Sequence, residues 1–249
     1  MLGNLRIHIT PVGYEFRRVT EPLVRMQADK VYLVTYRTDD SAKKYFASVK
    51  KELLQNYKHI QVEEVFVDIW DLYECLERFR SIVTQERAAG NFVYINVSTG
   101  TKVTAMAGML ACMLWGASPY YAPVSYPSAR TLDVPPTEHV EDPETFPVYE
   151  IRKPRPDQLK VLGMLKANSG KMRKAKLIEE LESARIIGLR DETKISLSAS
   201  AKHSQLRAIL NPMEREWNFI VVESSGRRSD VFLTEKGETA LKIFGASTA

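Results

Sequence analysis

The segment from Phe92 to Trp115 constrains the fold of this 249-residue chain more than any other. It begins with a run of β-branched and aromatic residues, Phe92 to Val97, which is typical of a strand buried on both faces. A small polar turn follows from Ser98 to Lys102, and apolar residues then recur at helical spacing from Val103 to Leu114. Strand, polar loop and helix in this order indicate one unit of an α/β fold with a parallel sheet.

The polar turn has a chemistry suited to an anion. Backbone N–H groups and the positive end of the helix dipole lie just beyond the strand, where ligands bind in α/β sheets. Lys102 is a cation in the first turn and opposes the dipole by roughly 0.3–1 kcal/mol, which a negative ligand would explain. We therefore expect Ser98, Thr99, Gly100, Thr101 and Lys102 to bind ligand. The alternative is that Ser98 or Thr99 only caps the helix and that Lys102 is solvated.

The motifs of several common enzyme classes are missing. The turn is no Walker A loop and carries no G-x-G-x-x-G, so NTP hydrolysis and NAD binding are disfavoured. The histidines, His8, His59, His139 and His203, are too scattered for a zinc site. We predict neither a metal nor a cofactor, and no catalytic residue.

The cysteines and the hydropathy pattern indicate a compartment. Cys75 and Cys112 lie in apolar helical patterns without a C-x-x-C motif, which predicts buried free thiols in a reducing environment. There is no signal peptide, and no apolar run is long enough to span a membrane. We therefore expect a cytoplasmic protein without a membrane partner.

Strand and helix patterns alternate four times in the first half of the chain. The pattern predicts a Rossmann-like, mainly parallel sheet with helices on both faces. Pro22 would kink or restart the first helix. Residues 125–146 read as a loop or linker, with a possible edge hairpin returning through Val148 to Ile151. The predicted strands cover residues 5–10, 31–35, 61–67, 92–97 and 120–124, and the predicted helices cover 14–26, 40–57, 70–88 and 103–115.

The carboxyl ends of parallel strands share one edge of a sheet, and three loops meet there. These loops are Thr10 to Tyr14, Tyr36 to Thr38 and Ser98 to Lys102. They predict a polar, glycine-assisted and cationic pocket that contains Arg17, Arg37 and Lys102. Thr10, at the start of the first loop, belongs to the expected ligand site.

Charge divides the chain into two parts. Through Ile151 there are 16 Lys and Arg against 19 Asp and Glu, whereas from Arg152 onward there are 19 against 12. Pro154 and Pro156 lie at the change of composition. We therefore predict a first domain over residues 1–151 and a second domain over 152–249, whose net charge of +7 suits a polyanion.

The pattern of the second part is that of a winged helix-turn-helix domain. Helices are predicted from Pro156, after the basic segment Lys171 to Lys176, and after the cap residue Ser198; Pro212 would end or bend the third helix near Asn211. Two strands, 219–222 and 231–233, are joined by a tip with Arg227 and Arg228, and a final helix follows Thr234. Such domains read double-stranded DNA with the third helix in the major groove.

This geometry predicts which side chains contact DNA. With the apolar side of the third helix buried, Ser200, Ser204 and Arg207 face outward, and Arg207 can reach a guanine edge. The residues expected to contact phosphates are Lys171, Arg173, Lys174, Arg227 and Arg228. The alternative is a winged helix that serves for dimerisation or for docking another protein.

The combination of features resembles one known family. A Rossmann-like sheet with Ser98-Thr99-Gly100-Thr101-Lys102 after the fourth strand, a small-residue helix and a winged helix that closes through Leu233-Thr234-Glu235-Lys236-Gly237 resembles the CRISPR-associated Rossmann-fold (CARF) transcription regulators and their archaeal relatives. The family loop more often has two adjacent glycines where this chain has Gly100-Thr101.

This resemblance implies a homodimer whose paired Rossmann-like domains form one cleft. The cleft would bind a cyclic oligonucleotide, typically cyclic oligoadenylate, and signal to the DNA-binding domains. Gly13 and Tyr14 would line it from the first loop. A two-fold cleft suits a two-fold ligand, and the same axis matches a palindromic operator.

Two other functions remain open on the sequence. The first is a ring nuclease that cleaves cyclic oligoadenylate, with Lys102 and Ser98 or Thr99 stabilising the transition state. The turn contains no histidine or carboxylate to serve as a general base, which argues against it. The second is a regulator that responds to a different nucleotide or anionic metabolite.

Overall fold

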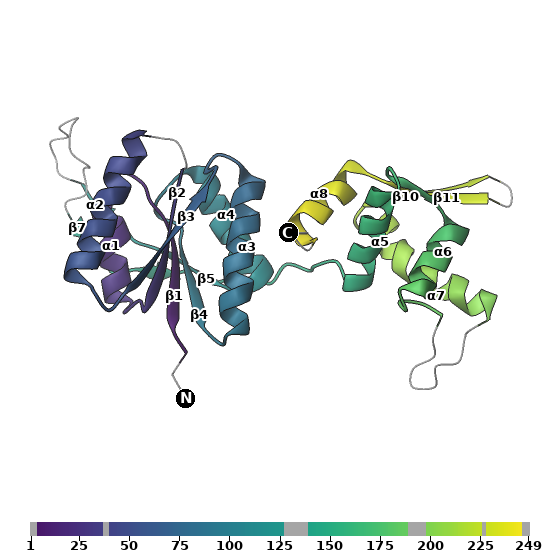
Figure 1. Cartoon of the computed structure of the whole chain (residues 1–249), viewed down its shortest axis with the longest axis horizontal. Coiled ribbons are helices and arrows are strands. Elements are labelled where there is room, and N and C mark those ends of the chain that lie inside the picture. The colour runs from purple at the N-terminus through teal and green to yellow at the C-terminus, as the bar shows by residue number, and fades with distance from the viewer. Residues whose placement is uncertain (1–3, 37–39, 127–138, 189–197, 226–227, 246–249) are drawn as a thin grey trace. The chain divides into compact units, whose positions relative to one another are not determined.

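The structure, a computed structural model, describes residues 4–36, 40–126, 139–188, 198–225 and 228–245 (Figure 1). The chain forms two compact units, Met1–Arg152 and Lys153–Ala249. Each unit has its own hydrophobic core. In the described residues no helix is both long and apolar enough to cross a lipid bilayer.

The first unit is an α/β fold built on a six-stranded sheet with the strand order β3-β2-β1-β4-β5-β8. The first five strands in this order pair in parallel, and the edge strand β8 is antiparallel to β5. The Rossmann-like class that the sequence predicts is confirmed. The elements of the sheet and its helices are β1 (Arg6–Pro11), α1 (Phe16–Arg25), β2 (Lys30–Tyr36), α2 (Asp40–Asn56), β3 (Gln61–Val67), α3 (Leu72–Ala88), β4 (Phe92–Asn96), α4 (Lys102–Trp115), β5 (Ser118–Tyr121) and β8 (Glu144–Thr145).

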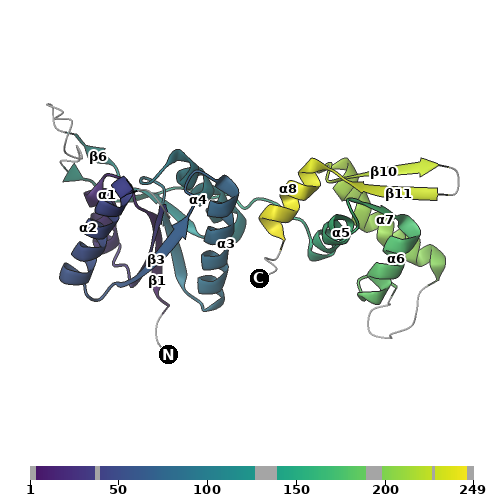
Figure 2. The same cartoon turned by 45° about the horizontal axis from the view of Figure 1, so that its top comes forward.

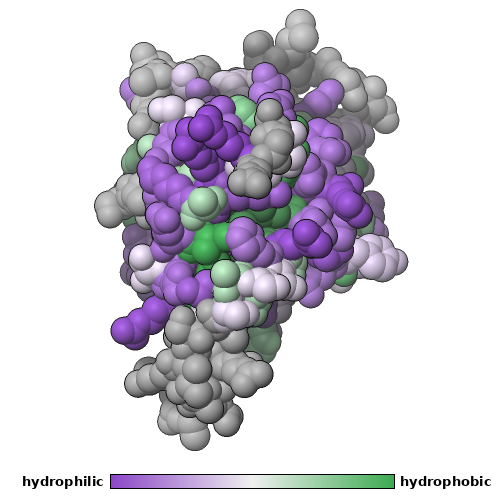
Figure 3. Space-filling view, turned by 90° about the vertical axis from the view of Figure 1, so that its right-hand side faces the viewer, coloured by the Kyte–Doolittle hydropathy of each residue, from purple (hydrophilic) through white to green (hydrophobic). Residues whose placement is uncertain are grey.

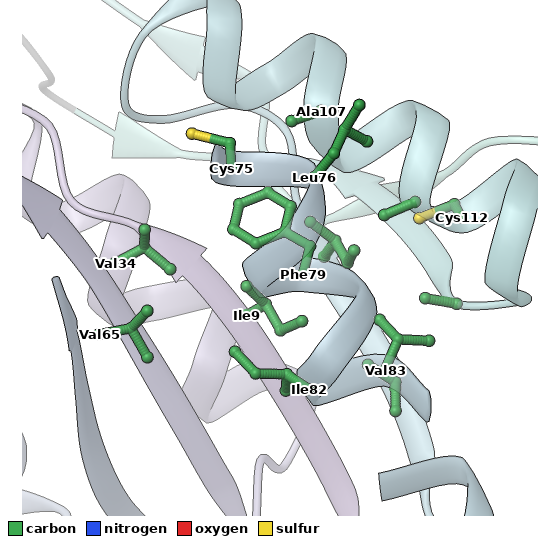
Figure 4. Packing of buried hydrophobic residues seen from close by; sticks show 14 of the residues in the cluster. Ile9, Val34, Val65, Cys75, Leu76, Phe79, Ile82, Val83, Ala107 and Cys112 are labelled. Carbon is green, nitrogen blue, oxygen red and sulfur yellow. The ribbon is translucent and has the colours of Figure 1, made fainter. Parts of the chain in front are cut away.

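Helices cover both faces of this sheet, α1 and α2 on one side and α3 and α4 on the other (Figures 1 and 2). The side chains of α3 point onto the strands, where Phe79, Ile82 and Val83 pack with Ile9 of β1 (Figure 4). Alternate positions of the strands face α1 and α2, whose core includes Val31 and Leu33. A strand that is apolar on both faces is therefore buried on both faces, as the sequence pattern predicts.

The cysteines belong to the same core. Cys75 and Cys112 are free and buried, as predicted. Burial raises the pKa of each thiol to about 12, so neither is a reactive thiolate at neutral pH.

The segment that returns to the edge of the sheet after residue 140 differs from the sequence prediction. The edge strand is β8, and residues 148–151 form no strand. Pro147, which has no N–H to donate to a ladder, separates the two segments, and the Ile151 N–H donates to the Met113 carbonyl of α4 instead. A short separate pair, β6 (Val124–Ser125) with β7 (His139–Val140), flanks this part of the chain.

The second unit has the winged helix arrangement that the sequence predicts. Three helices precede a hairpin, and a last helix closes the unit (Figure 2). The hairpin pairs with a short strand, β9, that the sequence did not reveal, which gives a sheet of order β10-β11-β9. The elements are α5 (Pro156–Ala167), β9 (Lys171–Arg173), α6 (Lys174–Ser183), α7 (Ala199–Arg215), β10 (Ile220–Ser225), β11 (Arg228–Leu233) and α8 (Glu235–Phe244).

The sequence predicts that Pro212 ends or bends α7 near Asn211. The helix does not end there, because it continues to Arg215. A proline leaves the carbonyl four residues earlier without its helical donor. Here that carbonyl belongs to Ala208, and the guanidinium of Arg155 donates to it at 3.5 Å. Pro22 is likewise accommodated inside α1, which runs on to Arg25 without restarting.

Candidate functional site

A cleft of about 400 Å³ lies at the carboxyl ends of β1 and β4 in the first unit. Its walls come from the loop between β1 and α1, from the loop between β4 and α4, and from the segment after β6. Two of these walls are the loops that the sequence brings to this edge. The cleft is lined by Gly13, Tyr14, Glu15, Ser98, Thr99, Gly100 and Tyr126.

Two glycines allow the loops to approach each other closely. A Cβ atom on Gly13 would lie 2.9 Å from the backbone N of Gly100, which is nearer than real Cβ atoms come. Gly100 has a φ of +82°, and a Cβ there would lie 2.6 Å from Pro11 Cβ. The Thr99 hydroxyl donates to the Pro11 carbonyl at 2.6 Å and fastens the two loops. Both glycines are therefore required by the shape of the cleft.

The N-terminus of α4 is closed by Thr101 rather than by Ser98 or Thr99. The Thr101 hydroxyl accepts from the Thr104 N–H at 3.1 Å and donates to the Ile69 carbonyl at 2.8 Å. Ser98 instead donates its hydroxyl to Asn96 Oδ1 and accepts from the Ala122 N–H at 2.9 Å. The structure thus places Thr101 as the helix cap, outside the lining of the cleft, while the other cap candidates remain in the lining.

The cleft is less cationic than the sequence predicts. Lys102 is exposed and is not among the lining residues. Arg17 is exposed and lies 3.9 Å from Glu21, and Arg37 falls outside the described residues. Among the described lining residues the charged side chain is Glu15. Neither Arg17 nor Lys102 lines this cleft, whose lining offers aromatic and carboxylate groups, and the cationic pocket stays a prediction.

A buried arginine joins the β1–α1 wall of the cleft to the end of β5 and the residue that follows it. Arg18, on α1, is only 5% exposed. Its Nη1 donates to Glu15 at 2.7 Å, its Nε donates to the Ala122 carbonyl at 3.0 Å, and its guanidinium lies 4.9 Å from the Tyr121 ring centroid. Burial opposes the charge, but the hydrogen bond and the charge of Glu15 outweigh it and raise the pKa of Arg18. This cation holds the carboxylate that lines the cleft.

A layer of buried polar side chains lies on the face of the sheet that α1 and α2 cover. Thr10, an expected ligand residue, is fully buried in this layer and does not line the cleft. Asn96 donates from Nδ2 to the Arg18 carbonyl at 3.1 Å. His8 lies between the rings of Tyr94 and Tyr120, at centroid distances of 5.1 and 5.4 Å. The sequence signal for this layer is the set of polar residues inside otherwise apolar strands.

Metal chemistry finds no support in the described residues. No three of their His, Cys, Asp and Glu side chains are grouped to hold a metal ion.

The second unit carries the other predicted site. On α7, Ser200, Ser204 and Arg207 are exposed, and the opposite side of the helix is buried, in the orientation that the sequence predicts. The face of the unit in Figure 3 is mostly hydrophilic around a smaller hydrophobic area. Polar side chains on the third helix of a winged helix unit are placed to read DNA.

The expected phosphate contacts differ in their surroundings. Lys171 lies 3.0 Å from Asp230 and 4.6 Å from the Phe232 ring centroid, so its charge is partly compensated. Arg173 and Arg228 are exposed, and Lys174 is half-buried at the start of α6. Arg227 falls outside the described residues.

Fold and sites together define a class of protein in which a Rossmann-like unit with a polar cleft precedes a winged helix unit. Residues 6–126 match the family model described as HFX_2341_N:-like, N-terminal. Residues 157–245 match the model of the DUF6293 C-terminal winged helix domain, so the second unit is a winged helix domain by sequence as well as by structure.

Two archaeal proteins are similar in sequence. An uncharacterised protein of Archaeoglobus fulgidus is 26% identical over 240 residues, which are 96% of this chain and 98% of that protein. An uncharacterised protein of Methanocaldococcus jannaschii is 31% identical over 112 residues, which are 43% of this chain and 33% of that protein. The match thus spans about a third of the length of the second relative.

A similar solved structure is that of Can2 from Sulfobacillus thermosulfidooxidans in complex with cyclic tetra-adenylate. It is 14% identical, with a TM-score of 0.42, over 96% of this chain and 64% of that chain.

Proposed function

We propose that this protein is a ligand-responsive, DNA-binding transcription regulator. The single observation that supports it best is the polar, outward side of α7 in a winged helix domain, with Ser200, Ser204 and Arg207 exposed. The net charge of +7 from Arg152 onward adds long-range attraction for a polyanion.

Binding to duplex DNA tests this function directly. The full chain should bind a labelled duplex of about two helical turns with an affinity that falls steeply as salt rises. The variant Arg173→Ala with Arg228→Ala should bind more weakly to all sequences, with a salt slope smaller by about 0.9 for each phosphate that is no longer neutralised. Lys160→Ala, an exposed lysine on α5, is the matched control. A salt slope equal to that of the wild type would contradict the role of these arginines.

The ligand site belongs to the same proposal. The cleft at the strand ends of the first unit takes an anionic ligand, and the resemblance to CARF regulators favours a cyclic oligonucleotide such as cyclic tetra-adenylate. A ligand at 100 times its Kd adds about 2.7 kcal/mol of stability, which a thermal shift detects. A panel with mononucleotides and anionic metabolites distinguishes the alternative ligands. No shift with any cyclic oligoadenylate would refute the ligand class and leave the DNA test unaffected.

The proposed assembly is a homodimer. A dimer with a two-fold axis brings two winged helix units to two half-sites of a palindromic operator. Light scattering of the full chain at micromolar concentration should give twice the mass of 28.3 kDa. A monomer at these concentrations, with and without cyclic oligonucleotide, would contradict this part.

A second candidate function is cleavage of the cyclic ligand, because the structure places a carboxylate, Glu15, in the cleft wall. A carboxylate near a bound ribose could act as a general base. Incubation with cyclic tetra-adenylate should then give linear products that the variant Glu15→Gln does not form. Recovery of intact ligand from the wild type would exclude this activity.

A further inference from the structure

A second cavity lies in the winged helix unit, where the start of α6, one side of α7 and β10 meet. Its volume is about 100 Å³, and its lining includes Lys174 of α6 together with His203 and Arg207 of α7. A cavity needs about 10–15 Å³ of water-accessible volume to hold one water molecule. The cavity therefore has room for a group the size of a phosphate.

The two cations of this cavity make no ion pair in the described residues. In the described part of the unit, Lys174 and Arg207 form no ion pair, whereas Lys171 and Lys202 pair with Asp230 and Glu182. The start of α6 adds the positive end of a helix dipole, and Arg173, its N-cap residue, makes no side-chain capping bond. An anion in the cavity would meet two fixed positive charges and a helix N-terminus.

The carboxylate in the cavity lining, Glu214, accepts a hydrogen bond from strand β10. Glu214 Oε1 accepts from the Val222 N–H of β10 at 2.9 Å, which ties the carboxylate to the wing. Two cations against one carboxylate leave the lining with a positive charge. This balance favours a group with a single negative charge, which is the charge of a phosphodiester.

The position of Arg207 on the helix gives the same result. At about 100° per residue, His203 and Glu214 lie on one side of Arg207, and Asn211 lies on the other. All four residues line the cavity, so Arg207 stands in the middle of the cavity wall that α7 provides, and its side chain is exposed.

We propose that this cavity holds one phosphate of the DNA backbone, between Lys174, His203 and Arg207. Arg207 is then a positioning contact and not the reader of a guanine edge, and Ser200 and Ser204 face the bases. A guanidinium binds two phosphate oxygens at once, and an ammonium adds a point charge. This inference rests on the proposed DNA-binding function and specifies the contact made at one place.

The test is Arg207→Ala, because the two roles predict different changes. A phosphate contact predicts weaker binding to every duplex and a salt slope that falls by about 0.9, with an unchanged base preference in a selection from randomised duplexes. A base contact predicts loss of preference at one position with the slope retained, and that result would overturn the inference. Arg215→Ala, an exposed arginine on the same helix that does not line the cavity, is the matched control and should leave the slope unchanged.

Two further variants separate a local effect from misfolding. Lys174→Ala should lower the slope as Arg207→Ala does, while Glu214→Gln keeps an acceptor for the Val222 N–H, removes one negative charge and should tighten binding at low salt. Weaker binding by a folded Glu214→Gln would count against the inference. If the wild type binds no duplex even at low salt, the proposed function fails, which is a different result from an unchanged slope in Arg207→Ala.

Discussion

At the scale of single residues, the buried imidazole of His8 gives the protein a built-in acid sensitivity. His8 is fully buried on β1, and its Nδ1 lies 3.4 Å from the Tyr120 hydroxyl. Burial, with a smaller effect from the charge of Arg6, lowers its pKa from 6.5 to about 3. The native state therefore keeps this side chain neutral at pH values where the unfolded chain protonates it.

The direction of the pH dependence follows from this difference. Between pH 6.5 and 3 the unfolded state binds one more proton at this site, so the free energy of unfolding falls as the pH is lowered. The loss is at most about 1.4 kcal/mol per pH unit. His8→Gln, which does not titrate, should show a smaller fall between pH 7 and pH 5 in urea unfolding.

A second measurement, on the wild type, tests the same prediction in case His8→Gln is itself destabilised. Titration of the wild-type His8 imidazole by NMR should show no protonation down to pH 5. A midpoint near 6.5 would contradict the prediction, as would equal pH slopes for His8→Gln and the wild type.

The sequence identified some residues of the candidate site and missed others for a physical reason. Ser98, Thr99, Gly100, Gly13 and Tyr14 were found because they lie in loops that any parallel sheet brings to one edge. The burial of Arg18 was not predictable, because the Ala122 carbonyl that holds it is 104 residues away in sequence. Long-range contacts of this kind leave no local pattern.

At the scale of elements, Thr101 decides how α4 begins. It makes a reciprocal capping box with Thr104, in which the hydroxyl of each residue accepts from the backbone N–H of the other. Loss of such a cap costs about 0.5–2 kcal/mol. Thr101→Ala should lower the free energy of unfolding by about 1 kcal/mol, measured by urea unfolding of the full chain.

The control for this prediction keeps the hydroxyl. Thr101→Ser should stay within a few tenths of a kcal/mol of the wild type, since Ser and Thr cap almost equally well. Equal stabilities of Thr101→Ala and Thr101→Ser would show that the cap does not stabilise α4. Because Thr101 lies outside the lining of the cleft, neither change should remove a ligand contact.

Elements with a strong local period were predictable, and short ones were not. The helices and the central strands repeat apolar residues over several turns or pleats, and each was expected close to its observed bounds. β8 and β9 contain two and three residues, and they are strands only because β5 and β11 pair with them. α7 continues past Pro212, and the Ala208 carbonyl that the proline leaves without a helical donor accepts from Arg155, the N-cap residue of α5.

At the scale of the whole molecule, composition carried information that single motifs did not. The change of charge near residue 152 separates a mildly acidic part from a basic part, and the winged helix domain coincides with the basic part. The electrostatic character of the cleft was not predictable in the same way. Charged residues near the cleft in sequence, such as Arg17 and Lys102, do not line it in the structure.

The proposed regulator makes one prediction that concerns both units at once. If a ligand in the cleft changes the affinity for DNA by some factor, DNA must change the affinity for that ligand by the same factor, because binding free energies are linked. Coupling of 1–3 kcal/mol, which is typical, corresponds to roughly 5–150-fold. Cyclic tetra-adenylate affinity, measured with and without saturating duplex, should therefore change as much as duplex affinity does with and without ligand. Binding of both partners with no change in either affinity would show two independent binding units, and the protein would then bind DNA without being regulated by its cleft.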